Sequence, residues 1–273
     1  MNAPMKSLMH RTMPRTMPRT MPRTMNDCDR LSALISRFEM TVTPAPDGDG
    51  NLAILGCPGI GEPRMVVFSP RGEANCCSDD PVLVSAHASW GGDANPLLTA
   101  LPAKICFDAT GDEEMTLLLR LFMAEAKARR CGAQPVLNRL GEVLVIKLLR
   151  VEISRGATAP GLVAGLADPR LARAIVAMHD DPGRAWRNDD LATEAGLSLS
   201  RFAETFLETV GETPQSYLRR WRMTLARQDI RRGERVQTVA RRYGYGSPEA
   251  LSRAFSRQFD INPLALRREA AHA

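Results

Sequence analysis

The chain has 273 residues, of which 44% are hydrophobic, and this length and composition suggest two domains with ordinary cores. The formal net charge is +5, and the basic excess is concentrated: thirteen arginines and four acidic residues lie between Thr213 and Arg268. No apolar run approaches the roughly 18 residues needed to cross a bilayer, and no signal-peptide core follows the basic start. We therefore expect a cytoplasmic protein, without a membrane partner, whose C-terminal part favours a polyanion.

Residues 1–28 contain a repeated Thr-Met-Pro-Arg unit between positions 12 and 24. Proline at every fourth position removes amide donors and blocks a helix, so we predict a disordered basic tail. Its charge could support weak nucleic-acid contact. We favour a translated DNA repeat upstream of the true start, which would make Met25 a candidate initiator.

Residues 29–154 are predicted to form one domain. A short amphipathic helix is expected over Asp29–Phe38. Short apolar runs separated by Pro, Gly and Asp then predict strands, and these lie at 52–55, 65–68, 82–84 and 105–107. The pattern indicates a small β-barrel or jelly roll, although the region is short for a full barrel. Two helices follow, one beginning near Met115 and one over 137–153, and their apolar faces suggest packing on both sides.

Residues 155–168 have the composition of a linker. Asp168 and Pro169 then predict the cap and the first residue of a helix, and residues 169–273 are predicted to be all helical. The expected fold class is thus α+β, with an N-terminal small β-barrel plus helices and a C-terminal all-α domain.

The C-terminal domain contains an internal repeat. Each copy has a Gly that can adopt a left-handed turn (Gly196, Gly244), followed by a Ser that can cap the next helix (Ser198, Ser247). The apolar positions after the two serines correspond at a constant offset, with Phe202, Phe206 and Val210 matching Leu251, Phe255 and Phe259. Each copy is therefore predicted to be a helix-turn-helix unit. A long helix over 214–232 joins them and could place both second helices in successive major grooves, about 34 Å apart.

Residues 186–268 resemble the AraC/XylS family of transcription regulators. The resemblance rests on residues that run through most of the domain, among them Trp186, Leu191-Ala192, Ala195-Gly196-Leu197-Ser198, Thr213-Pro214, Tyr217-Leu218, Arg222, Val239-Ala240, Gly244-Tyr245, Leu251-Ser252-Arg253-Ala254-Phe255 and Pro263. The N-terminal half resembles the cupin-type sensor domains of a subgroup of this family. The resemblance implies a DNA-binding regulator, more often an activator, with double-stranded DNA, RNA polymerase and an unknown effector as partners and a homodimer as a further option.

The predicted DNA contacts are exposed residues at the start and middle of each recognition helix. They are Ser198, Ser200, Arg201, Glu204 and Thr205 in the first unit, and Ser247, Glu249, Ser252, Arg253 and Arg257 in the second. Arg253 matches the position where the family commonly places an Arg in the major groove, where it could hold a guanine or a phosphate. Arg257 is expected on the DNA backbone. Glu204 departs from the family, which often has Arg there; it would repel phosphate but could accept a hydrogen bond from cytosine N4.

A sensing site in the N-terminal half could involve Cys57, Cys76, Cys77 and His87. Thiolates and an imidazole can bind a soft metal, and reactive cysteines can be oxidised reversibly. The resemblance to a subgroup that includes oxidant-responsive regulators adds interest to Cys76 and Cys77. Their spacing is no recognised zinc pattern, and cysteines are often buried and inert. A small organic ligand in the β-domain is an equally open hypothesis.

The main alternative is a cupin-type metal enzyme fused to a DNA-binding domain. Such enzymes need several histidines around one metal, and His87 is the only histidine between residues 29 and 170. We therefore expect no enzymatic activity, no cofactor and no bound metal. A second alternative is a regulator without a small-molecule effector.

Overall fold

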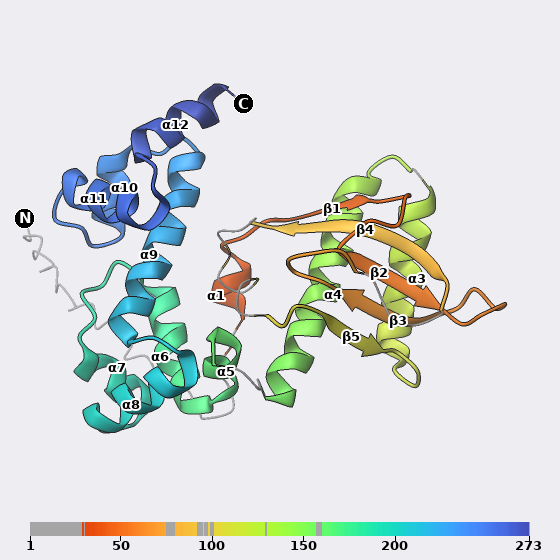
Figure 1. The fold of residues 1–273 in the computed structure, drawn as a ribbon, viewed down its shortest axis with the longest axis horizontal. Coiled ribbons are helices and arrows are strands. Elements are labelled where there is room, and N and C mark those ends of the chain that lie inside the picture. Colours follow the sequence, from red (N-terminus) through yellow and green to blue (C-terminus); the bar gives the residue numbers. More distant parts are fainter. Residues whose placement is uncertain are drawn as a thin grey trace, which may run out of the picture.

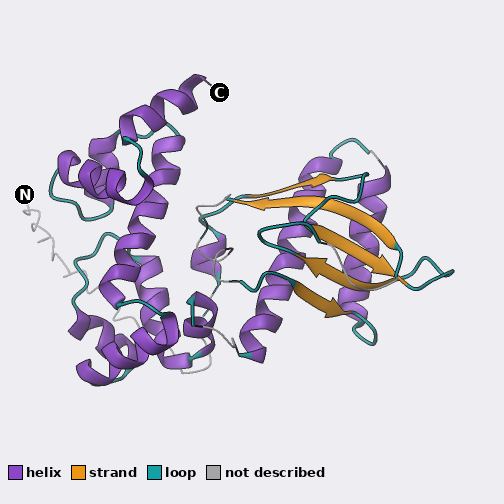
Figure 2. Cartoon of the chain, in the orientation of Figure 1, coloured by secondary structure: helices purple, strands orange, loops and turns teal. Residues whose placement is uncertain are grey.

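The computed structural model describes residues 29, 31–74, 80–91, 95, 98, 101–128, 130–156 and 160–272. The basic repeat of residues 1–28, and Cys76 and Cys77, lie outside the described residues. The strands belong to one part of the molecule and most of the helices to the other (Figures 1 and 2). In chain order the elements are α1 (Ser32–Ile35), β1 (Met40–Pro44), β2 (Leu52–Gly56), β3 (Pro63–Phe68), β4 (Val82–Trp90), β5 (Ile105–Asp108), α3 (Glu113–Ala128), α4 (Ala133–Arg155), α5 (Leu162–Ala167), α6 (Pro169–Asp180), α7 (Asn188–Ala195), α8 (Leu199–Val210), α9 (Pro214–Arg231), α10 (Val236–Arg242), α11 (Pro248–Phe259) and α12 (Pro263–His272).

The five strands form one antiparallel sheet in the order β1-β4-β2-β3-β5. The predicted strands are all present, and β1 adds one that the sequence analysis did not predict. The expected α+β fold class is confirmed, and the described strands of the β-domain form an open sheet with β1 and β5 at its edges.

One face of this sheet packs against α3 and α4, which run side by side across it (Figure 1). Val42, Ile54 and Val66 of the sheet are completely buried in the same core cluster as Leu119 and Leu144 of the two helices. The opposite face carries a second, smaller buried cluster of Ala53, Leu55, Val67 and Ala74. Burial on both faces explains why β2 is an unbroken apolar run rather than an alternating one.

The edge strand β1 is held by α4. Asn138 of α4 accepts a hydrogen bond from the Val42 amide at 2.8 Å, and the Gln134 side chain donates to the Val42 carbonyl at 2.7 Å. A side chain at Gly141 would overlap Val42, so glycine at this point lets the helix approach the strand closely. The pairing groups on this edge of the sheet are thus covered in part by a helix.

The segment with linker composition contains a packed helix. Leu162, Val163 and Leu166 of α5 are buried, and α5 packs against α4, α6 and α8. The Pro160–Gly161 pair precedes the helix, and the Gly161 amide donates to the carbonyl of Thr209 at 3.0 Å. The composition of this segment therefore did not reveal the short helix that connects the two parts of the molecule.

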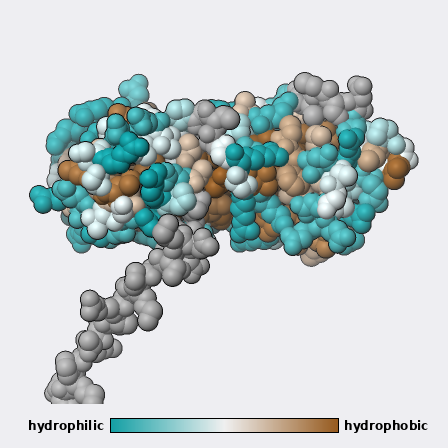
Figure 3. All heavy atoms as spheres, turned by 90° about the horizontal axis from the view of Figure 1, so that it is seen from below, coloured by the Kyte–Doolittle hydropathy of each residue, from teal (hydrophilic) through white to brown (hydrophobic). Residues whose placement is uncertain are grey.

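A second connection between the two parts runs through Phe38, which follows α1. Its carbonyl accepts a hydrogen bond from the Trp90 indole of β4 at 2.9 Å, and its ring lies 6.0 Å from the ring of Trp221 in α9. The helix α1 itself is shorter than the predicted 29–38, because Asp29 caps it and it ends at Ile35. In the view of Figure 3, hydrophilic residues cover most of the surface, and apolar patches lie on both parts and between them.

The C-terminal part is all helical, as predicted. Asp168 accepts from the amides of Arg170 and Leu171 and caps α6, with Pro169 as its first residue. Thr213 caps α9 in the same way, again with a proline directly after it. No helix among the described residues is both long and apolar enough to span a bilayer.

Candidate nucleic-acid interface

The first helix-turn-helix unit consists of α7 and α8. The turn between them is built as predicted: Gly196 has a φ of 67°, and the Ser198 hydroxyl accepts from the Arg201 amide at 3.4 Å. The Leu197 amide donates to the carbonyl of Ala192 at 2.9 Å, five residues back, which ends α7. Phe202 and Phe206 are completely buried beneath α8, so its other side is left for a partner.

The second unit, α10 and α11, repeats this construction. Gly244 has a φ of 74°, the Ser247 hydroxyl accepts from the Ala250 amide at 3.2 Å, and the Tyr245 amide donates to Ala240 at 2.8 Å. Leu251 and Phe255 are completely buried beneath α11. Two copies of the same turn, each followed by a capped helix, thus lie along α9 (Figure 1).

The two units are attached to α9 by different polar contacts. Beside the first unit, His179 of α6, the helix that packs against α7, is fully buried, and its Nε2 lies 2.6 Å from the hydroxyl of Tyr217 in α9. Burial lowers the pKa of His179 to about 3, so the ring is neutral at pH 7. In the second, Asp229 of α9 accepts from the hydroxyl of Tyr243 at 2.7 Å and pairs with Arg242.

The structure exposes most of the residues that were predicted as DNA contacts in the first unit. Ser198, Ser200, Arg201 and Glu204 lie on the surface, and Arg201 forms a 2.9 Å ion pair with Glu204. Thr205 is a correction, because its side chain is 8% exposed and faces the core beside Phe206. The helical period at that point turns the residue inward, so it cannot reach a groove without a change in packing.

The predicted residues of the second unit lie on one side of α11. Glu249, Arg253 and Arg257 are exposed, and Ser252 is half-buried with its hydroxyl donating to the Pro248 carbonyl at 2.8 Å. The Ser247 hydroxyl lowers the pKa of Glu249 by hydrogen bonding, and Arg253 lowers it further. Glu249 is therefore charged at neutral pH, and the surface of this helix has one carboxylate and two guanidinium groups.

Several arginines of the basic segment have structural partners. Arg220 bonds Glu212 at 2.6 Å, Arg242 pairs with Asp229 and Glu234, and Arg227 lies 5.0 Å from the centre of the Phe259 ring. Arg222 donates to the backbone of the loop between α6 and α7. Sequence reasoning missed these roles because an arginine in a basic helix gives no sign of which partner it faces; Arg222 was noted only as a family position. Arg219, Arg241 and Arg268 remain exposed.

The predicted sensing residues do not form a cluster in the described part of the chain. Cys57 follows β2 just beyond the Leu55–Val82 pair, whereas His87 lies beyond the Leu52–Ala86 pair at the other end of the same strand. These positions are on the order of 15 Å apart along the sheet. His87 is exposed and lies 3.4 Å from Asp49, and the residues described include no group of three or more metal-ligating side chains. Cys57 and His87 therefore do not share one site, and a sensing role for the cysteines stays a prediction.

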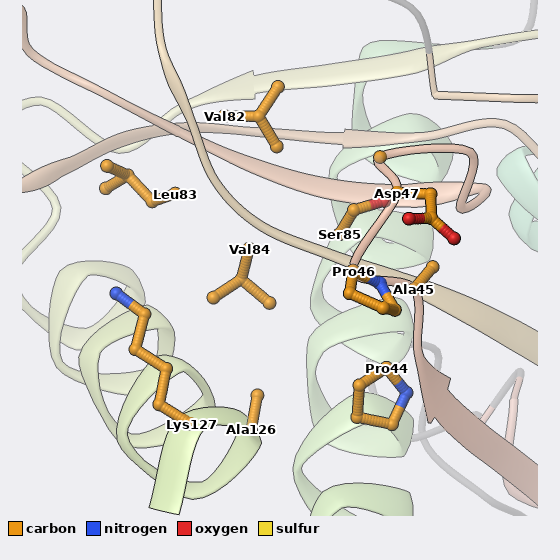
Figure 4. A pocket seen from close by; sticks show the side chains of 11 residues that line it. Pro44, Ala45, Pro46, Asp47, Val82, Leu83, Val84, Ser85, Ala126 and Lys127 are labelled. Atoms are coloured by element: carbon orange, nitrogen blue, oxygen red, sulfur yellow. The ribbon is translucent and has the colours of Figure 1, made fainter.

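A groove of about 700 Å³ lies at one end of the sheet. Its walls are the β1–β2 loop, the start of β4 and the end of α3, and most of them are apolar (Figure 4). Lys127 and Asp47 lie on opposite sides of the Val84 side chain in this view (Figure 4). A small organic ligand in the β-domain was one open hypothesis from the sequence, but none of these residues was named for it, because they come from three separate segments.

Comparisons with known proteins agree with this division of the chain. Residues 191–269 match the model of a helix-turn-helix domain, and residues 40–154 match the model of a cupin domain. Together these matches define a two-domain protein with a cupin domain ahead of a helix-turn-helix domain, and the boundaries agree with α7–α12 and β1–α4.

The relatives identify the helix-turn-helix domain more closely. The chain is 35% identical over 190 residues to a protein of Streptomyces lividans named a putative AraC-like transcription regulator. The aligned region covers 68% of this chain and 62% of that one. The chain is 32% identical to the transcriptional regulator AlkR of Acinetobacter baylyi, over 64% of this chain and 59% of that one. It is 29% identical to the RCS-specific transcriptional activator RclR of Escherichia coli, over 74% of each chain.

The chain thus spans less than two thirds of the length of the first two relatives. The predicted resemblance is confirmed: the chain combines an AraC-family helix-turn-helix domain with an N-terminal cupin domain.

Proposed function

We propose that this protein is a sequence-specific, DNA-binding transcription regulator rather than an enzyme. The observation that carries the proposal is the pair of capped helices α8 and α11, each with a buried aromatic side and an exposed polar side, joined by the single helix α9. A helix presented in this way fits the major groove of B-DNA. Two of them on one chain suit two adjacent grooves on one face of the duplex.

In this proposal Arg253 contacts a guanine edge and Arg257 a phosphate. Arg219, Arg241 and Arg268 are exposed and add phosphate contacts that carry no sequence information. Binding should therefore weaken with salt, with a slope set by the number of phosphates neutralised. Arg220 and Arg242, which pair with acids, and Arg222, which bonds backbone carbonyls, do not contribute to this slope.

The N-terminal domain is proposed to control this DNA binding in response to a signal. The groove beside Lys127 is large enough for a small organic effector, since ligand sites in proteins run from about 300 to 1,000 Å³. The Phe38–Trp221 contact links this domain to α9, and so offers a physical route from the effector to the DNA-binding units. We propose that the protein activates transcription through RNA polymerase in the cytoplasm. The name of one matched relative describes an activator, and the names of two others describe regulators.

We also propose that two copies associate through α3 and α4. Leu117 and Leu121 of α3 and Val136 and Val143 of α4 are each exposed by more than two fifths. The two helices lie side by side (Figure 1), and the Lys147–Glu114 ion pair at 2.7 Å joins the start of α3 to the second half of α4, as in an antiparallel pair. Exposed apolar side chains gathered on two neighbouring helices would suit an interface between subunits.

Footprinting of the purified full-length chain on the DNA that flanks its own gene tests the proposed function. Protection of two adjacent major grooves that survives excess random DNA is the expected result. Repeating the experiment with oxidant, and measuring thermal stabilisation by a library of small organic compounds, separates a thiol signal from a ligand signal. Protection of no discrete site would refute sequence-specific binding.

A further inference from the structure

A single arginine ties the two helix-turn-helix units together at a point that neither recognition helix reaches. Arg222 lies in the middle of α9, and its guanidinium donates from Nε to the Pro182 carbonyl at 2.6 Å and from Nη2 to the Arg184 carbonyl at 2.7 Å. Both carbonyls belong to the loop between α6 and α7, which leads into the first unit. The side chain is half-buried, and its two donors on two carbonyls of the same loop fix the orientation of the guanidinium.

The same loop also contacts the second unit. A side chain at Gly183 would overlap the Arg242 carbonyl at the end of α10, and one at Gly244 would lie 2.6 Å from the Gly183 carbonyl. Two glycine backbones therefore meet between the loop of the first unit and the turn of the second. The Arg222 guanidinium lies within 3.7 Å of where a side chain at Gly244 would begin, so it holds the loop at this meeting point.

The loop is itself stiff. The Trp186 indole donates to the Asp181 carbonyl at 2.9 Å, and the Arg184 guanidinium lies 3.9 Å above the Trp186 ring. The Trp186 carbonyl accepts from Gln215 of α9 at 2.9 Å. A movement of the second unit relative to the first must therefore break the Arg222 contacts or separate the Gly183–Gly244 contact, because the loop cannot bend to follow it.

We propose that the contact between Arg222 and the Pro182–Arg184 loop, closed by Gly183 and Gly244, sets the spacing and rotation at which α8 and α11 meet DNA. Arg222 is thus a positioning residue for half-site spacing, without a DNA contact of its own. The inference rests on the proposed DNA-binding function. It adds that α9 alone does not fix the geometry of the two units, and that the spacing preference of the protein resides in this contact.

The test uses the full chain and a DNA site selected from a random-sequence pool. Inserting or deleting one base pair between its half-sites rotates one half-site by about 35° and shifts it by about 3.4 Å. The wild type should bind these altered sites at least about tenfold more weakly than the selected site, the scale of one lost base contact. Arg222→Met should reduce this ratio to about two- to threefold, while its affinity for DNA with a single half-site stays at the wild-type value.

Two further variants separate positioning from folding and from charge. Gly183→Ala retains Arg222 but pushes the loop away from α10, and it should lower the spacing preference in the same way. Arg231→Met removes the same charge from an exposed position on the same helix and should keep the wild-type preference. Thermal unfolding shows that each variant is folded at the assay temperature.

The inference is overturned if the folded Arg222→Met and Gly183→Ala variants keep the wild-type spacing preference, or if they weaken binding to all of the DNAs equally. A wild-type protein that selects no site from the pool overturns the proposed function itself, and this inference with it. A wild type that selects a site but tolerates the altered spacings overturns the inference alone.

Discussion

The two helix-turn-helix units have the same backbone construction but present different chemistry. Both have a left-handed glycine in the turn, a serine cap and two buried apolar residues one helical turn apart. On the exposed side, however, the first unit presents an Arg201–Glu204 ion pair whose charges cancel. The second unit presents Arg253 and Arg257, together with one acid, Glu249, near the start of α11. The two copies therefore share the residues that fold each unit, and they differ in the exposed residues that would contact a partner.

If the protein binds DNA as proposed, this difference predicts different shares of the binding for the two units. A helix with two free guanidinium groups gains directly from phosphates and guanine edges, and its contribution falls steeply with salt. A helix whose arginine is already paired must break that pair first, so it contributes less affinity and more dependence on the exact base. We expect the second unit to dominate affinity and the first to refine specificity.

The largest effect is expected from the buried phenylalanines that the two units share. Phe206→Ala and Phe255→Ala should each lower the free energy of unfolding by about 3–5 kcal/mol, since both rings are completely buried and leave a cavity. Phe206 packs on Phe202 and Tyr217, and Phe255 packs on Phe259, so each substitution should open mainly its own unit. Hydrogen exchange measures this directly: equal loss of protection in α8 and α11 in either variant would show that the units unfold as one.

Removal of the charged group of Arg253 comes next. Arg253→Ala should weaken binding to the selected site by about 10- to 100-fold, equivalent to about 1–3 kcal/mol, and should relax base preference at one position. Arg257→Ala should weaken binding to all sequences alike and reduce the salt slope by about one. Fluorescence anisotropy at several salt concentrations distinguishes the two. If Arg253→Ala leaves the affinity and base preference unchanged, the assignment of base contact to the second unit is wrong.

Acid should separate the two units, because among the residues described only the first unit packs against a helix with a buried histidine, α6. His179 has a folded pKa of about 3 against 6.5 when exposed, so the unfolded chain binds more protons below pH 6.5. The stability that depends on the neutral ring is present above pH 6.5 and is lost as the pH falls towards 3. The loss amounts to about 2 kcal/mol at about pH 5.

Urea unfolding of wild type and His179→Gln between about pH 7 and pH 5 measures this loss. The glutamine variant should show the smaller decrease, and amides of α6–α8 in the wild type should lose protection before those of α10–α11. An identical pH dependence in both proteins would mean that another group controls acid unfolding.

The sequence predicted the second half of the molecule better than the first, and the reason is physical. Turn glycines, capping serines and apolar spacing are local signals, so α7–α8 and α10–α11 followed from the residues themselves. β1 was missed because Met40-Thr-Val-Thr alternates instead of forming an apolar run, although its burial pattern is that of an edge strand. The inward turn of Thr205 and the partners of Arg222 depend on which helix packs against which, and that information is not local.

The smallest effect is expected from a substitution at Glu204, the acidic residue that pairs with Arg201 on the exposed side of the first unit. Glu204→Gln should change the free energy of unfolding by no more than about 0.5 kcal/mol, because exposed ion pairs contribute little to stability. The variant frees Arg201 to contact a phosphate, so its affinity for DNA at about 50 mM salt should rise about two- to fivefold and its salt slope should increase by about one.

Glu208→Gln removes the same charge one turn further along the exposed side of α8 but leaves the Arg201–Glu204 pair intact, and it is the matched control. Its smaller gain in affinity would reflect net charge alone. A loss of affinity in Glu204→Gln, with weaker preference for one cytosine, would instead mean that the carboxylate accepts a hydrogen bond from that base. In that case the first unit reads bases through an acid where the second uses an arginine, and the two exposed surfaces would differ in kind rather than in degree.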